Sequence, residues 1–108
     1  MIKTNNTKIN MSHGDYGQIV PFNISGIALD GTQDKILFEI KKASNSYTIL
    51  SKIYTNKITS LNEFQFDLEF TQKESLLLNR GDYVYYLKHI RDNELQDTII
   101  EAEPFIVS

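Results

Sequence analysis

The 108-residue sequence contains no cysteine, and this absence excludes several kinds of chemistry. A chain without thiols forms no disulfide scaffold, holds no thiolate-bound metal and offers no cysteine nucleophile. Because small extracellular sandwich domains often carry a disulfide bridge, the absence favours folding in a reducing cytoplasm. A chain of this length buries roughly two-thirds of its unfolded surface, which is enough for one core without covalent links.

Long apolar runs and a basic charge balance are missing as well. No apolar run approaches the ~20 residues that a membrane-spanning helix needs, and residues 1–10 lack the apolar stretch of a secretory signal. The formal net charge of −3 argues against nucleic acid or an anionic membrane as the main partner, because both favour basic surfaces. We therefore expect no nucleic-acid partner, no membrane partner and no secretory signal.

Helical periodicity is equally scarce, which excludes nucleotide-binding α/β folds. A single short helical turn is expected near residues 71–78, where Thr71 and Glu74 have the spacing of a capping box. The rest of the chain has the pattern of about seven or eight short strands at roughly 8–12-residue spacing, typical of a β-sandwich or barrel. We expect residues 7–108 to form a single domain and residues 1–6 to be a flexible N-terminal arm.

Alternation of apolar and polar residues predicts which side chains face the core. The predicted inward positions are Val20, Phe22 and Ile24, then Ile36, Phe38 and Ile40, then Tyr47, Ile49 and either Ser51 or Ile53, then Phe64, Phe66, Leu68 and Phe70. Pro21 cannot donate a backbone hydrogen bond, so its strand should be an edge strand or a bulged one. An edge strand at Pro21 could contact neighbouring subunits by strand addition.

The segment Leu78–Tyr83 has the spacing of a tyrosine corner. Gly81 offers a permissive backbone two residues before Tyr83, and the Tyr83 hydroxyl should bond to the backbone just upstream. Such a corner joins late strands of immunoglobulin-like domains, although Tyr85 stands where a cysteine is usual. We therefore predict an all-β fold, an immunoglobulin-like antiparallel sandwich, in which Leu78, Gly81 and Tyr83 are structural.

Reactive residues are not arranged as a catalytic or metal site. His13 and His89 are the only histidines, and His13 has just Asp15 nearby in sequence, which is too few ligands for a metal. His89 falls on the same strand face as Tyr85, where a partly buried structural role is expected. No Gly-x-Ser-x-Gly elbow is present. We expect no enzyme activity, no catalytic residue and no cofactor.

The opposite face of the tyrosine-rich strand offers the best functional lead. Val84 and Tyr86 point away from the core there, beside Leu37 if the two strands are neighbours. An apolar patch outside a sandwich core usually marks an interface. We interpret Val84, Tyr86, Leu37 and the edge at Pro21 as a protein–protein interface. A carbohydrate platform that uses Tyr86 or Tyr54 remains the alternative.

Six short segments, spread over nearly the whole chain, carry a resemblance to a known family: Gly14-Asp15-Tyr16-Gly17, residues 34–42, residues 64–68, residues 78–85, residues 97–100 and Pro104-Phe105-x-Val107. They resemble small structural proteins of tailed phages and prophages of low-GC Gram-positive bacteria, in particular the N-terminal domains of upper baseplate proteins. Tyr86 departs from the polar or acidic residue expected there.

The resemblance implies a non-enzymatic virion protein, made in the bacterial host cytoplasm, that forms part of a tail or baseplate or decorates the particle. Its partners would be other virion proteins, with the chain present as a homo-oligomer or in many copies. It implies no catalytic residue. Two other classes of function stay open: a carbohydrate-binding module that recognises a host cell-surface glycan, and an accessory domain of a cytoplasmic enzyme.

Overall fold

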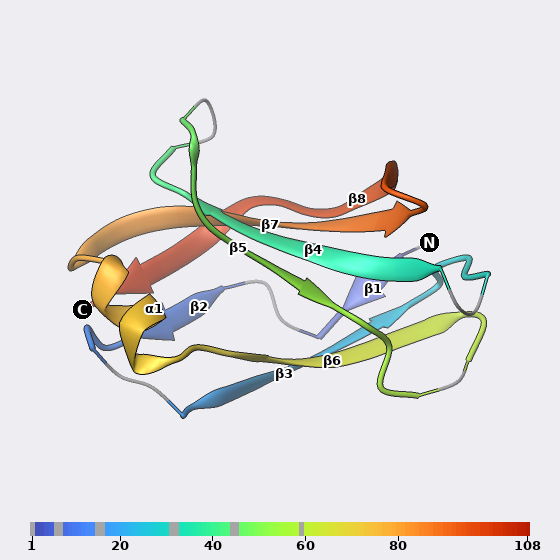
Figure 1. The fold of residues 1–108 in the computed structure, drawn as a ribbon, viewed down its shortest axis with the longest axis horizontal. Helices are drawn as coiled ribbons and strands as arrows, with labels where there is room; N and C mark the ends of the chain where they lie inside the picture. The colour runs from blue at the N-terminus through green and yellow to red at the C-terminus, as the bar shows by residue number, and fades with distance from the viewer. Residues whose placement is uncertain (1, 6–7, 15–16, 31–32, 44–45, 59) are drawn as a thin grey trace.

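Two β-sheets face each other across an apolar core in the computed structural model, which describes residues 2–5, 8–14, 17–30, 33–43, 46–58 and 60–108 (Figure 1). The three-stranded sheet has the order β1-β3-β6, and the five-stranded sheet has the order β2-β8-β7-β4-β5. The strands are β1 (Lys3–Thr4), β2 (Ile9–Met11), β3 (Ile19–Ser25), β4 (Asp34–Lys41), β5 (Thr48–Tyr54), β6 (Glu63–Glu69), β7 (Gly81–Arg91) and β8 (Glu94–Val107). The prediction of a β-sandwich with one short helix is confirmed at this level.

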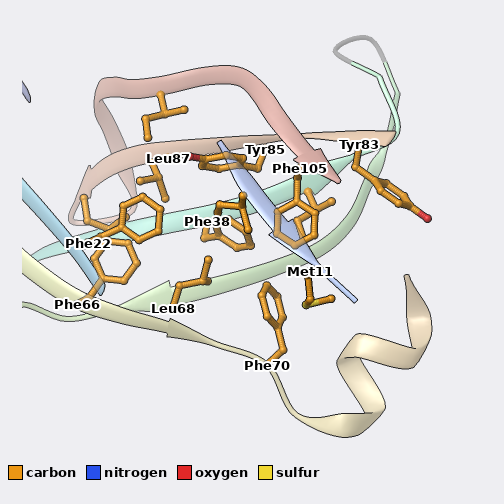
Figure 2. Packing of buried hydrophobic residues seen from close by; sticks show 14 of the residues in the cluster. Met11, Phe22, Phe38, Phe66, Leu68, Phe70, Tyr83, Tyr85, Leu87 and Phe105 are labelled. Atoms are coloured by element: carbon orange, nitrogen blue, oxygen red, sulfur yellow. The ribbon is translucent and has the colours of Figure 1, made fainter. Parts of the chain in front are cut away.

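Aromatic rings fill the space between the sheets (Figure 2). Phe22 of β3 stacks on Phe66 of β6 with ring centroids 5.1 Å apart, and its edge meets Tyr85 of β7 at 6.4 Å. Phe38 and Phe105 continue the cluster beside Tyr85 at 5.7 and 6.3 Å. These separations are those of favourable ring pairs, so each contact adds to the free energy gained from burial. The predicted inward positions of β3, β4 and β6 are confirmed, apart from Val20, which is half-buried.

The predicted inward face of residues 47–53 is wrong at Tyr47, Ser51 and Ile53, whereas Ile49 does pack against the core. Leu50, Lys52 and Tyr54 lie opposite the buried residues Ile40, Phe38 and Ile36 of β4, so these three face inward. Ser51 and Ile53 are exposed instead. A lysine can occupy an inward position here because its ammonium lies over the Phe70 ring, with Nζ 5.5 Å from the ring centre, and has polar partners at the open side of the sandwich. The Lys52 Nζ atom donates to the Glu69 carbonyl at 2.6 Å and pairs with Glu74 at 2.9 Å.

Residues 1–6 are predicted to be a flexible arm, but Lys3 and Thr4 pair with Ser25 and Ile24 of β3 as strand β1. Met1 and Asn6 lie outside the described residues. Next to β1, the Asn5 side chain makes hydrogen bonds to the β3 backbone that a neighbouring strand would otherwise make. It donates from Nδ2 to the Pro21 carbonyl at 3.2 Å and accepts from the Asn23 amide at 2.8 Å.

Strand β3 is the middle strand of its sheet, but β1 pairs only with Ile24 and Ser25, so among the described residues β3 has no strand neighbour on that side at Pro21. The prediction of an edge at Pro21 therefore holds locally, and the described pairing of β3 with β6 contains no bulge. Pro21 pairs in regular register with Asp67 of β6. The missing N–H of proline is tolerated because the Asn5 amide, and not a strand, lies beside this part of β3.

Helix α1 (Gln72–Leu77) begins at the predicted capping box. The Thr71 hydroxyl accepts from the Glu74 amide at 3.2 Å, and the Glu74 carboxylate accepts from the Thr71 amide at 2.9 Å. Two backbone donors at the start of the helix are satisfied in this way. The helix lies at the end of the sandwich where the chain's C-terminus is found (Figure 1).

The tyrosine corner follows α1. The Tyr83 hydroxyl donates to the Asn79 carbonyl at 2.8 Å, as predicted. Gly81 has a φ of 151°, a backbone conformation that favours glycine. Leu78 is fully buried, and its carbonyl lies 2.8 Å from His13 Nδ1. The corner thus ties β7 to the helix and to the segment that follows β2.

We predict that Tyr83→Phe lowers the free energy of unfolding by about 0.5–1.5 kcal/mol, the net value of one hydrogen bond. Urea unfolding followed by circular dichroism measures the change. Tyr47→Phe is the matched control, since the Tyr47 side chain is 82% exposed and should lose nothing. Equal stability of Tyr83→Phe and the unmodified chain would show that the corner bond carries no net stability.

Candidate interaction surface

The outer face of the five-stranded sheet carries an exposed apolar surface. In register, Leu37 of β4 lies beside Ile53 of β5, and Ile90 of β7 pairs with Leu95 of β8. Ile53 and Leu95 are 60% and 59% exposed, whereas Leu37 and Ile90 are half-buried between them. We call these four residues the outer apolar surface. Exposed apolar side chains that gather on one face typically mark a contact site.

Two shallow hollows accompany the outer apolar surface, and both are bordered by Ile90 and Asn93. The first has a volume of about 290 Å³ and is also lined by Gln33, Lys35, Ile53 and Asp92. The second has a volume of about 270 Å³ and is also lined by Leu37, Lys88 and Leu95. The two hollows therefore share Ile90 and Asn93 as a common border.

The β7–β8 hairpin positions one side of this surface. Asp92 and Asn93 form its two-residue turn, and both have positive φ values, 53° and 64°. Asparagine and aspartate tolerate this conformation better than most residues, and the twist of such a turn suits a tight hairpin. The turn brings Leu95 back beside Ile90.

The other half of the same face is polar, and it covers Tyr86. The Lys41 and Lys88 Nζ atoms lie 4.9 and 5.4 Å from the centre of the Tyr86 ring. Lys88 also pairs with Glu39 at 2.7 Å, and Glu39 accepts from the Thr48 hydroxyl at 3.0 Å. Tyr86 is 6% exposed as a result. The prediction that Tyr86 is an exposed apolar residue is wrong, because two lysines cover its ring.

The four predicted interface residues therefore do not form one patch. Leu37 belongs to the outer apolar surface, while Val84 is half-buried on the polar half of the same face, in register with Lys41 and Pro104. Pro21 is exposed on β3 of the other sheet. Whether any of them contacts a partner stays a prediction.

Sequence reasoning missed Ile53, Ile90 and Leu95 as part of this surface. Each is an isolated apolar residue in its own strand pattern, and only the pairing of β5, β4, β7 and β8 brings them together. The Asp92-Asn93 dipeptide, which suits a two-residue hairpin turn, is the signal that could have placed Ile90 beside Leu95. Nothing in the local pattern indicated that Ile53 lies next to Leu37.

The described residues contain a buried polar cluster at His89, on the inner face of β7 as predicted. His89 Nε2 lies 2.6 Å from Asp34 Oδ1, which also accepts from Arg91 Nε at 2.9 Å. His89 Nδ1 lies 3.4 Å from the Asp97 carboxylate. Because the two ring nitrogens face different carboxylates on opposite sides, the three groups cannot converge on one metal ion. Among the described residues no group of three metal-ligating side chains is found, and Asp15, the predicted neighbour of His13, lies outside them.

The aromatic residues of the carbohydrate alternative are not open platforms. The Tyr54 ring stacks on Phe66 with centroids 4.7 Å apart, and burial raises its pKa to about 12. Tyr86 is covered by lysines, as described above. Among the described tyrosines, Tyr47 has the most open ring, and sequence reasoning had placed it inward. The glycan alternative therefore lacks the two rings on which it depended.

Comparison with protein-family models, curated proteins and solved structures finds no match to this chain. No family is assigned on this basis, and the resemblance to phage baseplate proteins stays an expectation from the residues. In the described part of the chain, no helix has the length and hydropathy to cross a membrane.

We predict a loss of stability for Asp34→Ala, because it leaves the buried His89 ring without its partner at Nε2 and removes an acceptor from the half-buried Arg91. Leaving a buried polar group without its partner costs about 1–3 kcal/mol, and more for a charged group. Asp67→Ala is the control: it removes a carboxylate that pairs with Lys57 at the surface, which is worth no more than about 1 kcal/mol. Urea denaturation of both variants measures the difference, and similar losses would contradict the assignment of Asp34 as the centre of the cluster.

Acid sensitivity follows from Glu39. Partial burial works to raise its pKa, but hydrogen bonds from Lys88 and Thr48 and the charges of Lys88 and Lys41 together hold the pKa below the ordinary 4.5. A carboxyl whose pKa is lower in the folded state stabilises the fold above pH 4.5, and this contribution is lost as the pH falls through the folded value.

We therefore predict that Glu39→Gln makes the loss of stability below pH 4.5 shallower than in the unmodified chain. The loss is not abolished, since the pKa of Glu74 is also lowered: burial opposes this shift, but bonds from the Thr71 amide and Lys52 outweigh it. Thermal unfolding between pH 7 and pH 3 measures the slope. Glu94→Gln, at an exposed hairpin position, is the control and should leave the slope unchanged. An unaltered slope in Glu39→Gln would contradict the assignment.

Proposed function

We propose that this chain is a non-enzymatic structural component of a tailed bacteriophage particle, in the tail or baseplate or as a decoration, and that it acts through protein–protein contact. The observation that carries the proposal is the outer apolar surface. Leu37, Ile53, Ile90 and Leu95 contribute nothing to the core between the sheets, since they lie on the opposite face of their strands. Their burial against a neighbouring protein would release water from apolar area that the isolated chain leaves exposed.

The polar half of the same face supports contact rather than reaction. Glu39, Lys88, Lys41 and Thr48 satisfy one another around Tyr86 and leave no activated group there. A rim of paired charges beside an apolar centre is the usual composition of a protein interface. The neighbouring proteins proposed as partners are other virion proteins, and the particle would be assembled in the host cytoplasm.

We further propose that the sandwich is immunoglobulin-like. Strand order supports this assignment: β2 runs parallel to the last strand β8, and β8, β7, β4 and β5 follow in one sheet, while β1, β3 and β6 form the other. This distribution of strands between two sheets, with the first strand divided into β1 and β2, is that of a variant immunoglobulin sandwich. The hydrogen bond of the Tyr83 corner is a further feature of immunoglobulin-like domains.

The aromatic centre supports the same assignment. In immunoglobulin domains a disulfide joins the second and the sixth strand of the sandwich, and a tryptophan of the third strand packs against it. Here Phe22 of β3 meets Tyr85 of β7 at 6.4 Å, and Phe38 of β4 packs on Tyr85 at 5.7 Å. A ring pair thus takes the position of the disulfide, which suits a chain without cysteine that is made in a reducing compartment.

The resemblance to N-terminal domains of upper baseplate proteins supports the virion assignment specifically. Apart from Gly14-Asp15-Tyr16-Gly17, which lies between β2 and β3 in the sequence, its matched segments fall on β4, β6, the corner with β7, and β8, so they follow the sandwich rather than a reactive site. A glycan-binding role has less support, because Tyr54 and Tyr86 are packed.

We predict that Leu95→Lys lowers the amount of this chain in purified tailed particles by about tenfold, because a charge placed in an apolar contact costs at least ~1.4 kcal/mol. Quantitative mass spectrometry of particles banded from lysates measures the copy number. Leu76→Lys is the matched control: Leu76, on α1, is 53% exposed but lies outside the outer apolar surface, so its copy number should not change. Absence of the unmodified chain from particles would refute the proposed function, and equal copy numbers would refute the surface.

A further inference from the structure

Most edges of the two sheets are closed by the chain itself. β6 is sealed where the Gln65 carbonyl accepts from the Lys57 amide at 2.8 Å and the Gln65 amide donates to Asn56 at 2.9 Å. The Glu63 and Glu69 carbonyls of β6 accept from Asn56 and Lys52. Edge strands without such closure are a known site of pairing with other chains.

The remaining part of the three-stranded sheet is closed too. Asn5 occupies the side of β3 that β1 leaves uncovered, and β1 itself has two residues. At one end of the five-stranded sheet, β2 has three residues. Short edge strands offer few hydrogen bonds to a partner. These edges are poor templates for strand addition.

Strand β5 differs from every other edge. It has seven residues, and within the described part of the chain its backbone hydrogen-bonds with β4 alone. Every second residue of such an edge strand turns its N–H and C=O groups away from the sheet, where they can pair with another strand. Its composition, with Thr48, Ile49 and Ile53, favours the extended conformation.

Charge does not protect this edge. Lysine on an edge strand commonly discourages pairing, and Lys52 is the one charged residue of β5. Its ammonium is directed across the opening of the sandwich to Glu74 and the Glu69 carbonyl, however, and is neutralised there. The exposed outward positions, Ser51 and Ile53, are uncharged.

We propose that two copies of this chain pair through β5, antiparallel and around a two-fold axis at Ser51, so that the two five-stranded sheets continue into one. The position of the two-fold axis follows from the placement of charged residues along β5. With Ser51 opposite itself, Lys52 lies opposite Leu50, and no like charges face each other. An axis at Lys52 would oppose two lysines. Ser51 lies in the segment Leu50–Tyr54, which stays in regular register with β4.

The proposed dimer extends the proposed role in protein contact, but it does not depend on that role, because the pairing needs no phage particle. The outer faces of both sheets lie on the same side after such pairing, so the outer apolar surfaces of the two copies become one continuous contact face. Leu95 lies at the far side of the sheet from β5, which separates the two ideas experimentally.

Cysteine cross-linking tests the pairing cleanly, because the natural chain has no cysteine. Directly opposed residues of antiparallel strands have Cα atoms about 4.5–5.5 Å apart, within the roughly 4.4–6.8 Å that a disulfide spans. Under mild oxidation we expect Ser51→Cys to form a disulfide-linked dimer at least about tenfold faster than Thr98→Cys, because pairing raises the effective thiol concentration. Thr98 is exposed on the same sheet but lies on β8.

Light scattering of the unmodified chain gives an independent readout: a mass twice the 12.5 kDa of one chain is expected. Ser51→Lys should return the mass to that of one chain, since it opposes two lysines at the axis, while circular dichroism stays that of a folded sandwich. A monomeric unmodified chain, or equal cross-linking of Ser51→Cys and Thr98→Cys, would overturn the β5 dimer. Neither result bears on Leu95, so the proposed particle contact would be judged separately.

Discussion

Contact between aromatic rings of opposing sheets is the interaction on which the rest of this structure depends. Without cysteine, no disulfide joins the two sheets, and the Phe22–Tyr85 pair is a point where β3 of one sheet meets β7 of the other. Phe38 and Phe105 surround Tyr85 and extend the contact along the five-stranded sheet. Since ring packing is directional as well as apolar, it sets both the spacing of the sheets and their relative position.

The inner faces of both sheets are mostly apolar, and the polar side chains of His89 and Lys52 lie on them at the edges of the core, where each has a polar partner. His89 is a polar residue on the inner face of β7, and Asp34 and Arg91 compensate for its burial at the end of the sandwich. Lys52 closes the open side between β5 and β6. The outer face of the five-stranded sheet and the edge of β5 are the surfaces on which the proposals for protein contact rest.

The sequence predicted those parts of the structure that depend on neighbours along the chain. Phe64, Phe66 and Leu68 alternate cleanly, the Thr71–Glu74 capping box is local, and the Tyr83 bond spans four residues. The face of β5 was assigned wrongly because Lys52 occupies an inward position, where an apolar residue is expected. A lysine can do so only when a partner such as Glu74 is present, and sequence separation hides that partner.

The candidate surface was only partly predictable for the same reason. Tyr86 does point away from the core, but the lysines that cover it come from β4 and from its own strand. Leu37 was identified, whereas its neighbour Ile53 depends on the pairing of β4 with β5. Asn5 could not be foreseen as a substitute for a strand, because side-chain amides leave no periodic signal. Long-range pairing, rather than local propensity, decides which exposed residues lie together.

The proposal that the outer face of the five-stranded sheet is a protein-contact face is tested most directly by electron cryo-microscopy of the particle or complex that contains this chain. The account predicts density of a neighbouring protein against Leu37, Ile53, Ile90 and Leu95. Density that leaves this face in solvent, with contacts made through the three-stranded sheet instead, would contradict it.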